Sequence, residues 1–594
     1  MTTTSTDARG NRTEAGKDAR GPRVAIASRA TSTGAVVITA IVLAIALLTR
    51  LPQPLATPGW DGDEGYTLEI AWNLAHGDAR MFALEYRFVA HPPLAFAMIA
   101  PALATLGRDL AVVRAGAGVA GALAVAIVAW GLARAGLRRA AVLGGIALAV
   151  APFAVAYGRM GYTYGLLSLV VSATVAYLVE WRRDARTTGP SSAPREARTI
   201  AWLITLASLG PLIDHPGVAL PLLVAIEVRL ATRSWLAGAG ALALSLTPTI
   251  AFHTAVAWLD PAGSAEEWRQ VAARLGASAD PGATPEGAPI PTLATTVALL
   301  LANVSGLMRA AWWAPLAIAG LFAIPASAGR TTILRAFGLI AIPALAVRPI
   351  DPWFRTAIPL LPIMGWGLGA ILDRGVGAAF DLVEAVPGRG PIVPRLFGAV
   401  VSALVLLPLG LEAGATAVAV LPRASTHSLT PPFPRREGDP GGLGPFSREA
   451  EGLGPFSREA EALALGIDPW LIRDGKDARD AAAWVNARVL PTDLVITSPA
   501  VTWLITARVA DHLQATARAL SGRESRAVAF YPREIAETRW RFDPSVARAR
   551  YIILDQITDA WVAADPSTHR VFGPLAERTP TFRIGTYRVV PGGA

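Results

Sequence analysis

Residues 35–66 read AVVITAIVLAIALLTRLPQPLATPGWDGDEGY, an apolar run followed by a short acidic loop. The uncharged segment 30–49, to which the run belongs, is long enough to cross a bilayer as a helix, which takes about 20 residues. The loop after it carries Asp61, Asp63 and Glu64. Carboxylates are costly to bring near lipid, so an acidic cluster at a membrane edge usually marks a functional site. The stretch therefore predicts a membrane span that opens into a chemically active loop.

Similar apolar runs recur along the chain, for example at 115–133, 160–179 and 234–259. Of the 594 residues, 53% are hydrophobic, which is far more than an ordinary soluble protein carries. We therefore predict an all-α polytopic membrane protein with about 11–13 transmembrane helices. Two segments decide that number. We interpret 93–107 and 292–308 as interfacial or re-entrant helices on the outer face. If both segments cross the membrane, the number of transmembrane helices is thirteen.

The basic residues fall mainly in the short loops between the apolar runs. The formal charge of +9 is therefore better explained by membrane orientation than by nucleic-acid binding, so no nucleic-acid partner is expected. Residues 1–33 are predicted to form a disordered cytoplasmic tail, and the protein is predicted to lie in the plasma (cytoplasmic) membrane. The chain has no cysteine, which excludes disulfides, thiolate zinc sites and cysteine nucleophiles.

The C-terminal part is predicted to be soluble and extracytoplasmic. Residues 423–467 form a Pro/Gly-rich linker with a tandem ten-residue duplication, 442–451 and 452–461, too short for a repeat fold. Residues 468–594 are predicted to form a small α/β domain that acts as a lid or docks the acceptor. A helix is expected at 477–489 and strands at 493–497, 551–555 and 582–590.

Charge alternation places 51–110, the turn at 158–164, the hairpin at 214–216, the turn at 348–355 and everything after 422 on the outer face. Their ionisable side chains are the candidate site. The acidic cluster of Asp61, Asp63 and Glu64 suggests a general base or a metal ligand, although Asp-Gly pairs also favour plain turns.

The other candidates have structural alternatives as well. His91, in His-Pro-Pro-Leu, suits a phosphate or metal contact or simply a helix start, and Arg159 suits a phosphate or sugar contact or interfacial snorkelling. Asp214 beside His215 interrupts an apolar hairpin and would suit a divalent metal, although no ligand spacing fixes one. Arg348 and Arg355 suit a lipid phosphate, or pairing with Asp351.

With these residues in view, the chain resembles the GT-C superfamily of polyprenyl-phosphate-sugar-dependent glycosyltransferases, in the branch of bacterial protein mannosyltransferases and aminoarabinose transferases. The resemblance covers about 35–420. Its motifs run in order, each being weak alone: Asp63-Glu64 with Tyr66, His91-Pro92-Pro93-Leu94, Tyr157-Gly158-Arg159, Asp214-His215-Pro216, and Arg355 ahead of Leu360-Leu361-Pro362. Many relatives carry an aspartate where this chain has Tyr164, which puts a second acidic residue and a shared metal in doubt.

The resemblance implies a GT-C-like glycosyltransferase domain at 34–422, with 51–110 as its first outer catalytic loop. It would transfer a hexose or pentose from a polyprenyl-phosphate donor to a hydroxyl on protein, lipid or polysaccharide, with inversion. Asp63 would be the general base, with Asp61 or Glu64 as the alternative, and Arg355, Arg159 and His91 would stabilise the phosphate. Tyr66, Tyr164, Asp214, His215 and Arg348 would line the substrate site. A transporter or flippase of a lipid-linked sugar, or a non-catalytic scaffold, are the alternatives.

Overall fold

The computed structural model describes residues 21–56, 58–77, 92–187, 193–259, 311–345, 354–384, 475–520, 542–555, 566–576 and 581–593, with a few isolated positions between them. The linker at 423–467 lies outside the described residues. Helices dominate the chain up to residue 384, and all described strands lie after residue 493.

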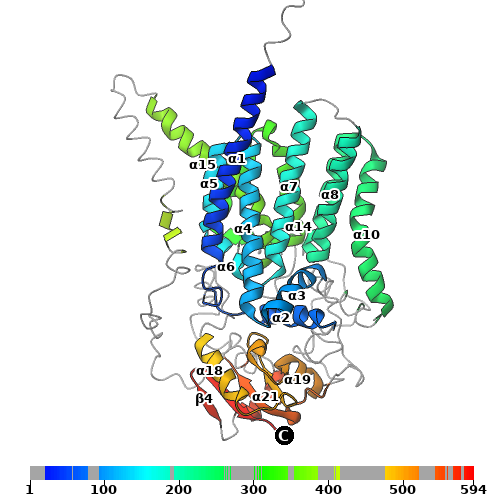
Figure 1. Cartoon of the computed structure of the whole chain (residues 1–594), viewed down its shortest axis with the longest axis vertical. Helices are drawn as coiled ribbons and strands as arrows, with labels where there is room; N and C mark the ends of the chain where they lie inside the picture. The colour runs from blue at the N-terminus through cyan, green and yellow to red at the C-terminus, as the bar shows by residue number, and fades with distance from the viewer. Residues whose placement is uncertain are drawn as a thin grey trace, which may run out of the picture.

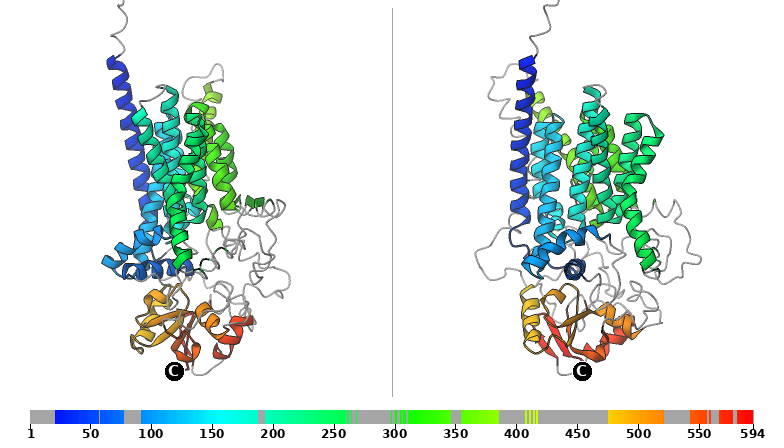
Figure 2. Two further views of the ribbon diagram at one scale, coloured as in Figure 1. Left: turned by 90° about the vertical axis from the view of Figure 1, so that its right-hand side faces the viewer. Right: turned by 45° about the vertical axis from the view of Figure 1, so that its right-hand side comes forward.

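The helical part is a bundle with two short helices lying across one end (Figure 1). Helices α2 (Gly62–Ala75) and α3 (Leu94–Leu106) lie at that end, between the bundle and the C-terminal domain, while the N-terminal end of α1 points the opposite way (Figure 2). The remaining elements are α1 (Gly21–Arg50), α4 (Leu110–Arg134), α5 (Arg138–Val150), α6 (Pro152–Arg159), α7 (Thr163–Thr187), α8 (Ala193–Ile213), η1 (His215–Val218), α9 (Ala219–Thr232), α10 (Trp235–Leu259), α13 (Ala314–Ala323), η2 (Ala326–Ala328), α14 (Arg330–Leu345), η3 (Phe354–Leu360) and α15 (Leu361–Glu384).

Five helices in the described residues are long and apolar enough to cross a membrane, or six if the bent pair α5 and α6 counts as one span. Several of the expected 11–13 crossings fall partly outside the described residues, and α13 is shorter than a full crossing. Helix α3 covers the expected interfacial segment 93–107. Its 13 residues are too few for the about 20 that a crossing needs. Most of segment 292–308 lies outside the described residues.

The apolar segment 140–157 is broken into two helices. Helices α5 and α6 meet at an angle of 60° around Ala151 and Pro152. Proline removes a backbone donor and clashes with the preceding turn, so it favours a kink or a break in a helix. The side chain of Arg50, which is buried, donates to the carbonyl oxygens of Ala149 at 3.0 Å and Leu148 at 3.4 Å. The break is therefore stabilised by a cation that satisfies carbonyls at the end of α5.

The start of α1 also differs from the expected tail. The helix begins at Gly21, so residues 21–33 are helical where disorder was predicted. Pro22 sits in the first turn, where its missing N–H costs nothing. No proline or glycine follows before Gly34, so nothing in the sequence interrupts the helix before the span.

Close backbone contacts hold the bundle together. A Cβ placed on Gly320 of α13 would lie 2.0 Å from the carbonyl oxygen of Gly367 in α15, so only glycine fits there. The same holds for Gly144 of α5, whose added Cβ would lie 2.7 Å from the Cα of Gly369. Helices pack by such small residues in membranes because lipid supplies no hydrophobic drive between them.

The C-terminal domain contains a five-stranded mixed sheet in the order β2-β1-β3-β5-β4. The parallel strands β2, β1 and β3 form one side, and the hairpin β4–β5 forms the other. The single strand expected at 582–590 is this hairpin, because Gly585 takes a left-handed conformation (φ 57°) and turns the chain. The elements are α18 (Gly475–Asn486), β1 (Leu494–Thr497), η4 (Thr502–Leu504), β2 (Arg508–Asp511), α19 (His512–Ala519), η6 (Val546–Arg548), β3 (Ala549–Leu554), α21 (Pro566–Ala576), β4 (Phe582–Ile584) and β5 (Tyr587–Pro591).

Candidate active site

The acidic cluster forms the first turn of α2. Asp61 is the N-cap, and its Oδ1 accepts a hydrogen bond from the N–H of Asp63 at 2.7 Å. Oε2 of Glu64 accepts in return from the N–H of Asp61 at 3.1 Å, which completes a capping box. Carboxylates at a helix N-terminus are also favoured by the helix dipole. Two of the three acids therefore have a clear part in starting the helix.

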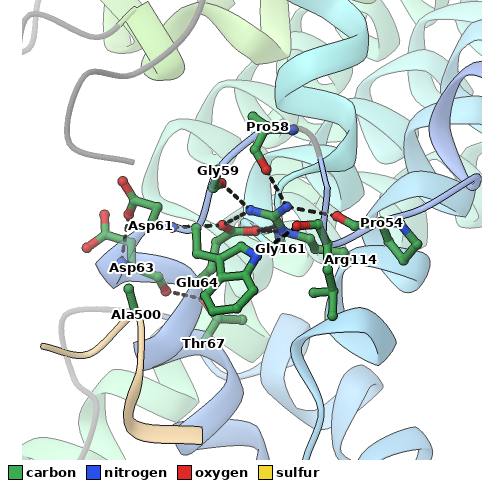
Figure 3. Close-up of polar contacts among 12 residues, drawn as sticks. Pro54, Pro58, Gly59, Asp61, Asp63, Glu64, Thr67, Arg114, Gly161 and Ala500 are labelled. Carbon is green, nitrogen blue, oxygen red and sulfur yellow. Dashed lines mark hydrogen bonds and ion pairs between the residues drawn. The ribbon is translucent and has the colours of Figure 1, made fainter. Parts of the chain in front are cut away.

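Glu64 is fully buried in an ion pair with Arg114 of α4, which is also fully buried (Figure 3). Nε of Arg114 donates to Oε1 at 2.7 Å, and a second guanidinium nitrogen donates to Oε2. Oε1 also accepts from the N–H of Gly161 at 2.6 Å. Each carboxylate oxygen thus accepts from one guanidinium nitrogen and one backbone N–H. We therefore assign Glu64 to holding α2 in place rather than to proton transfer.

The other bonds of Arg114 fix the loop that leads into α2. Its guanidinium donates to the carbonyl oxygens of Pro54 at 2.8 Å, Pro58 at 2.7 Å and Gly59 at 2.5 Å. Sequence reasoning missed Arg114. The sequence could have indicated it, because Arg114 is the only ionisable residue of the apolar run 110–133. A charge inside a membrane span is energetically costly unless it is paired or functional.

Asp63 occupies a different environment. It is half-buried, and in Figure 3 the carboxylates of Asp61 and Asp63 point to the side of the turn opposite Arg114. The carbonyl oxygen of Asp63 accepts from the hydroxyl of Thr67, so its backbone belongs to the regular helix. The side chain of Asp63 takes no part in the capping box of Asp61 and Glu64 or in the ion pair of Glu64 with Arg114.

Arg159, at the end of α6, is buried and contacts backbone. Its guanidinium donates to the carbonyl oxygens of Thr49 at 3.1 Å, Pro52 at 2.6 Å and Gln53 at 2.8 Å. With Arg50 and Arg114 it forms a group of three buried guanidinium ions near the start of the 51–60 loop, of which Arg114 pairs with the carboxylate of Glu64. The guanidinium groups of Arg50, Arg114 and Arg159 also donate to backbone carbonyl oxygens, whose dipoles partly offset their charge.

The turn at 158–164 and the hairpin at 214–216, both expected on the outer face, contact each other. The hydroxyl of Thr163 donates to Oδ2 of Asp214, and Oδ1 of Asp214 accepts from the N–H of His215 at 2.7 Å. The ring of His215 lies 6.3 Å from that of His253 in α10. The ring of Tyr164 packs edge-on to Tyr162 at 6.1 Å. Asp214 therefore caps η1 and connects it to the start of α7.

Other predicted site residues lie outside what the structure describes. His91 and Arg348 are outside the described residues, and Arg355 belongs to η3 without a described side chain. In the described part of the chain, no group of three or more His, Asp or Glu side chains is arranged to hold a metal ion.

The C-terminal domain shares an apolar core with α2, α3 and the start of α4. Trp60, just before α2, is buried at its centre. Its ring lies 5.3 Å from that of Trp503 in an edge-to-face arrangement, and Arg479 of α18 lies 5.4 Å from the ring centroid. The domain thus packs directly on the element that carries the acidic cluster.

The fold is similar to that of known membrane proteins, although no protein-family model and no curated protein sequence matches the chain. The crystal structure of ArnT from Cupriavidus metallidurans bound to undecaprenyl phosphate aligns with a TM-score of 0.55 and 15% identity. The alignment covers 93% of this chain and 97% of that one. The apo structure of the same protein gives 0.54 and 15% over 94% and 98%. A likeness over nearly the whole of both chains, at an identity this low, establishes the architecture: the protein has an ArnT-like GT-C fold.

Proposed function

We propose that the protein is a membrane glycosyltransferase that moves a sugar from a polyprenyl-phosphate donor to a hydroxyl acceptor. The observation that carries this proposal is the half-buried Asp63 at the N-terminus of α2, on a fold shared with ArnT, an aminoarabinose transferase whose crystal structure holds undecaprenyl phosphate. The reaction would take place at the end of the bundle that carries the C-terminal domain, which we expect to face the outside.

Asp63 acts as the general base. Asp61 and Glu64 are less suited, because the first caps the helix and the second pairs with Arg114. The acceptor hydroxyl gives its proton to the Asp63 carboxylate while its oxygen attacks the anomeric carbon from the face opposite the lipid phosphate. The bond between the anomeric carbon and the phosphate oxygen breaks, and its electron pair leaves with the polyprenyl phosphate. One displacement inverts the anomeric configuration.

The leaving phosphate needs positive charge. Arg159, expected to contact it, has hydrogen bonds to three backbone carbonyls instead, so we assign it a share in the positive field of Arg50, Arg114 and Arg159. A fixed positive field in a site shielded from water favours an anionic donor and the negative charge that develops on leaving. Direct contacts remain assigned to His91, Arg348 and Arg355.

The remaining residues would line the substrate site. Tyr164, Asp214 and His215 lie on the turn and hairpin that meet at the same end of the bundle, within reach of a sugar or a lipid headgroup.

The test follows a labelled sugar from polyprenyl-phosphate donors, both hexosyl and pentosyl, into membranes that contain the wild-type protein. We expect labelled acceptor and released polyprenyl phosphate in equal amounts, and neither in membranes without the protein. A labelled donor that crosses the bilayer uncleaved would contradict the proposal and favour a transporter of lipid-linked sugar.

A further inference from the structure

Helix α2 has a second set of contacts, on the side that faces the C-terminal domain. A Cβ placed on Gly65 would lie 1.8 Å from the carbonyl oxygen of Pro499, which follows strand β1. No side chain fits between the two backbones. One turn earlier, a Cβ placed on Gly62 would lie 3.9 Å from the Cβ of Pro499. The loop after β1 therefore packs directly on the turn that carries Asp63.

The next strand contributes a hydrogen bond to the same face of α2. The hydroxyl of Tyr66 donates to Oδ2 of Asp511, which is fully buried, at 2.9 Å. Oδ1 of Asp511 accepts from the N–H of Gln514 at 2.6 Å and caps α19. Because the carboxylate is buried, water does not compete for the Tyr66 bond. Asp511 therefore connects α2 to the interior of the domain.

A third contact lies one turn further along. Arg108, at the start of α4, pairs with Glu69 and donates to the carbonyl oxygens of Ile505 at 3.2 Å and Thr502 at 3.3 Å. Positions 62, 65, 66 and 69 follow the spacing i, i+3, i+4, i+7, so they share one face of the helix. That whole face is occupied by the C-terminal domain or by an arginine that contacts it.

The contacts from the domain come from one edge of its sheet. Thr497, the last residue of β1, pairs with Asp511, the last residue of β2, and the two strands run parallel. Pro499 and Asp511 therefore both lie at the carboxyl ends of neighbouring parallel strands. That edge is where open parallel sheets usually hold their ligands. Here it holds helix α2.

We infer that the C-terminal domain positions the catalytic helix, with Tyr66 and Asp511 as positioning residues that act on Asp63 through α2. The inference rests on the proposed function, in which Asp63 is the base. Arg114 holds the first turn from the bundle through Glu64, and the sheet edge holds it from the opposite side. Tyr66, predicted to bind substrate, is thereby assigned to the contact between the domain and the helix.

The contact itself is tested without any activity. Because the chain has no cysteine, the pair Gly62→Cys and Pro499→Cys introduces the only two thiols. The 3.9 Å between their Cβ positions lies within the roughly 3.5–4.5 Å that a disulfide requires. We expect mild oxidation to cross-link this pair. The matched pair Ala75→Cys and Pro499→Cys, with Ala75 at the far end of α2, should stay reduced. Failure of the first pair to cross-link would overturn the inference.

The positioning role is tested by kinetics. For Tyr66→Phe we expect kcat to fall roughly tenfold to a hundredfold while KM for the donor changes by less than about twofold, since a displaced base slows the chemical step and leaves donor binding intact. Tyr551→Phe makes the same change in the same apolar core and should leave both constants unchanged. In Asp511→Asn the amide oxygen still caps α19 and the amide nitrogen donates to the hydroxyl oxygen of Tyr66, so this variant should retain most of kcat, whereas Asp511→Ala should lose it.

The outcomes separate the two proposals. A cross-linked pair with a Tyr66→Phe variant that behaves like Tyr551→Phe would overturn the positioning role, leaving a purely structural contact. A wild-type protein that transfers no sugar from any polyprenyl-phosphate donor would overturn the proposed function, and the cross-link would still decide whether the sheet edge holds α2.

Discussion

Replacing Glu64 by glutamine removes the carboxylate that pairs with Arg114 and keeps the shape of the side chain. Both partners are fully buried, and each carboxylate oxygen accepts one guanidinium bond and one backbone bond, from Gly161 or Asp61. A glutamine has one oxygen to accept with, and its amide nitrogen would face two donors. The substitution therefore breaks two hydrogen bonds and leaves the Arg114 charge unbalanced.

The cost follows from the burial of the pair. Removing one partner of a buried ion pair costs about 3–5 kcal/mol, because the remaining charge stays desolvated. An exposed pair contributes only about 0–1 kcal/mol. Lys476 and Asp480 on α18 form such a pair, with both side chains largely in solvent. Asp480→Asn is therefore the matched control: the same chemical change without the burial.

Thermal unfolding of the detergent-solubilised protein, followed by tryptophan fluorescence, measures the difference. We expect the apparent Tm of Glu64→Gln to fall by several degrees, and sugar transfer to fall with it because the first turn of α2 loses its anchor. Asp480→Asn should match the wild type. A Glu64→Gln variant as stable as Asp480→Asn would refute the argument that this pair holds the turn.

Three further predictions concern the same turn and the domain beside it. Gly65→Ala should lower the free energy of unfolding by about 1–3 kcal/mol, because the added Cβ overlaps the carbonyl of Pro499. Gly116→Ala in α4, where the added Cβ meets open space, should leave that free energy unchanged or raise it slightly, and thermal unfolding distinguishes the two variants. Asp61→Asn should match the wild type in thermal stability and in sugar transfer, because asparagine is as good a helix N-cap as aspartate. Asp61→Ala should lower the free energy of unfolding by about 1 kcal/mol. Burial lowers the pKa of His512 from 6.5 to about 4, so the unfolded chain takes up the proton first as the pH falls. The contribution of neutral, buried His512 to the free energy of unfolding should be fully present above pH 6.5. It should fall by at most about 3 kcal/mol between pH 6.5 and pH 4. Unfolding at pH 7 and pH 5 checks this: His512→Gln should flatten the dependence, and the exposed-site change His569→Gln should not.

Local patterns in the sequence predicted much of the architecture. Apolar runs located the helices α4, α7 and α10, and a change in composition located the α/β domain. The strands β1 and β3 lie within two residues of their predicted bounds, because short buried strands are read directly from runs of apolar β-branched residues. Charge alternation placed the turn at 158–164 and the hairpin at 214–216 on the same face of the membrane, and the contact between Thr163 and Asp214 is compatible with that placement.

The roles of the individual side chains could not be predicted in the same way. The spacing of Asp61 and Glu64 is that of a capping box, a signal that local reasoning can use. The partner of Glu64 is 50 positions away in Arg114, and the partner of Tyr66 is Asp511, across the whole chain. Such pairs depend on how elements pack, and a single sequence carries no record of that. The break at Pro152 was readable, but its stabilisation by Arg50 was not.

The measurement that tests the central claim most directly compares purified wild type with Asp63→Asn, matched for amount and thermal stability, for donor binding and for sugar transfer. The account predicts that Asp63→Asn binds the polyprenyl-phosphate donor as wild type does and loses transfer by about 10²–10⁴-fold, the usual contribution of a general base. Transfer by Asp63→Asn at the wild-type rate would contradict the assignment of Asp63 as the base and with it the mechanism proposed for this fold.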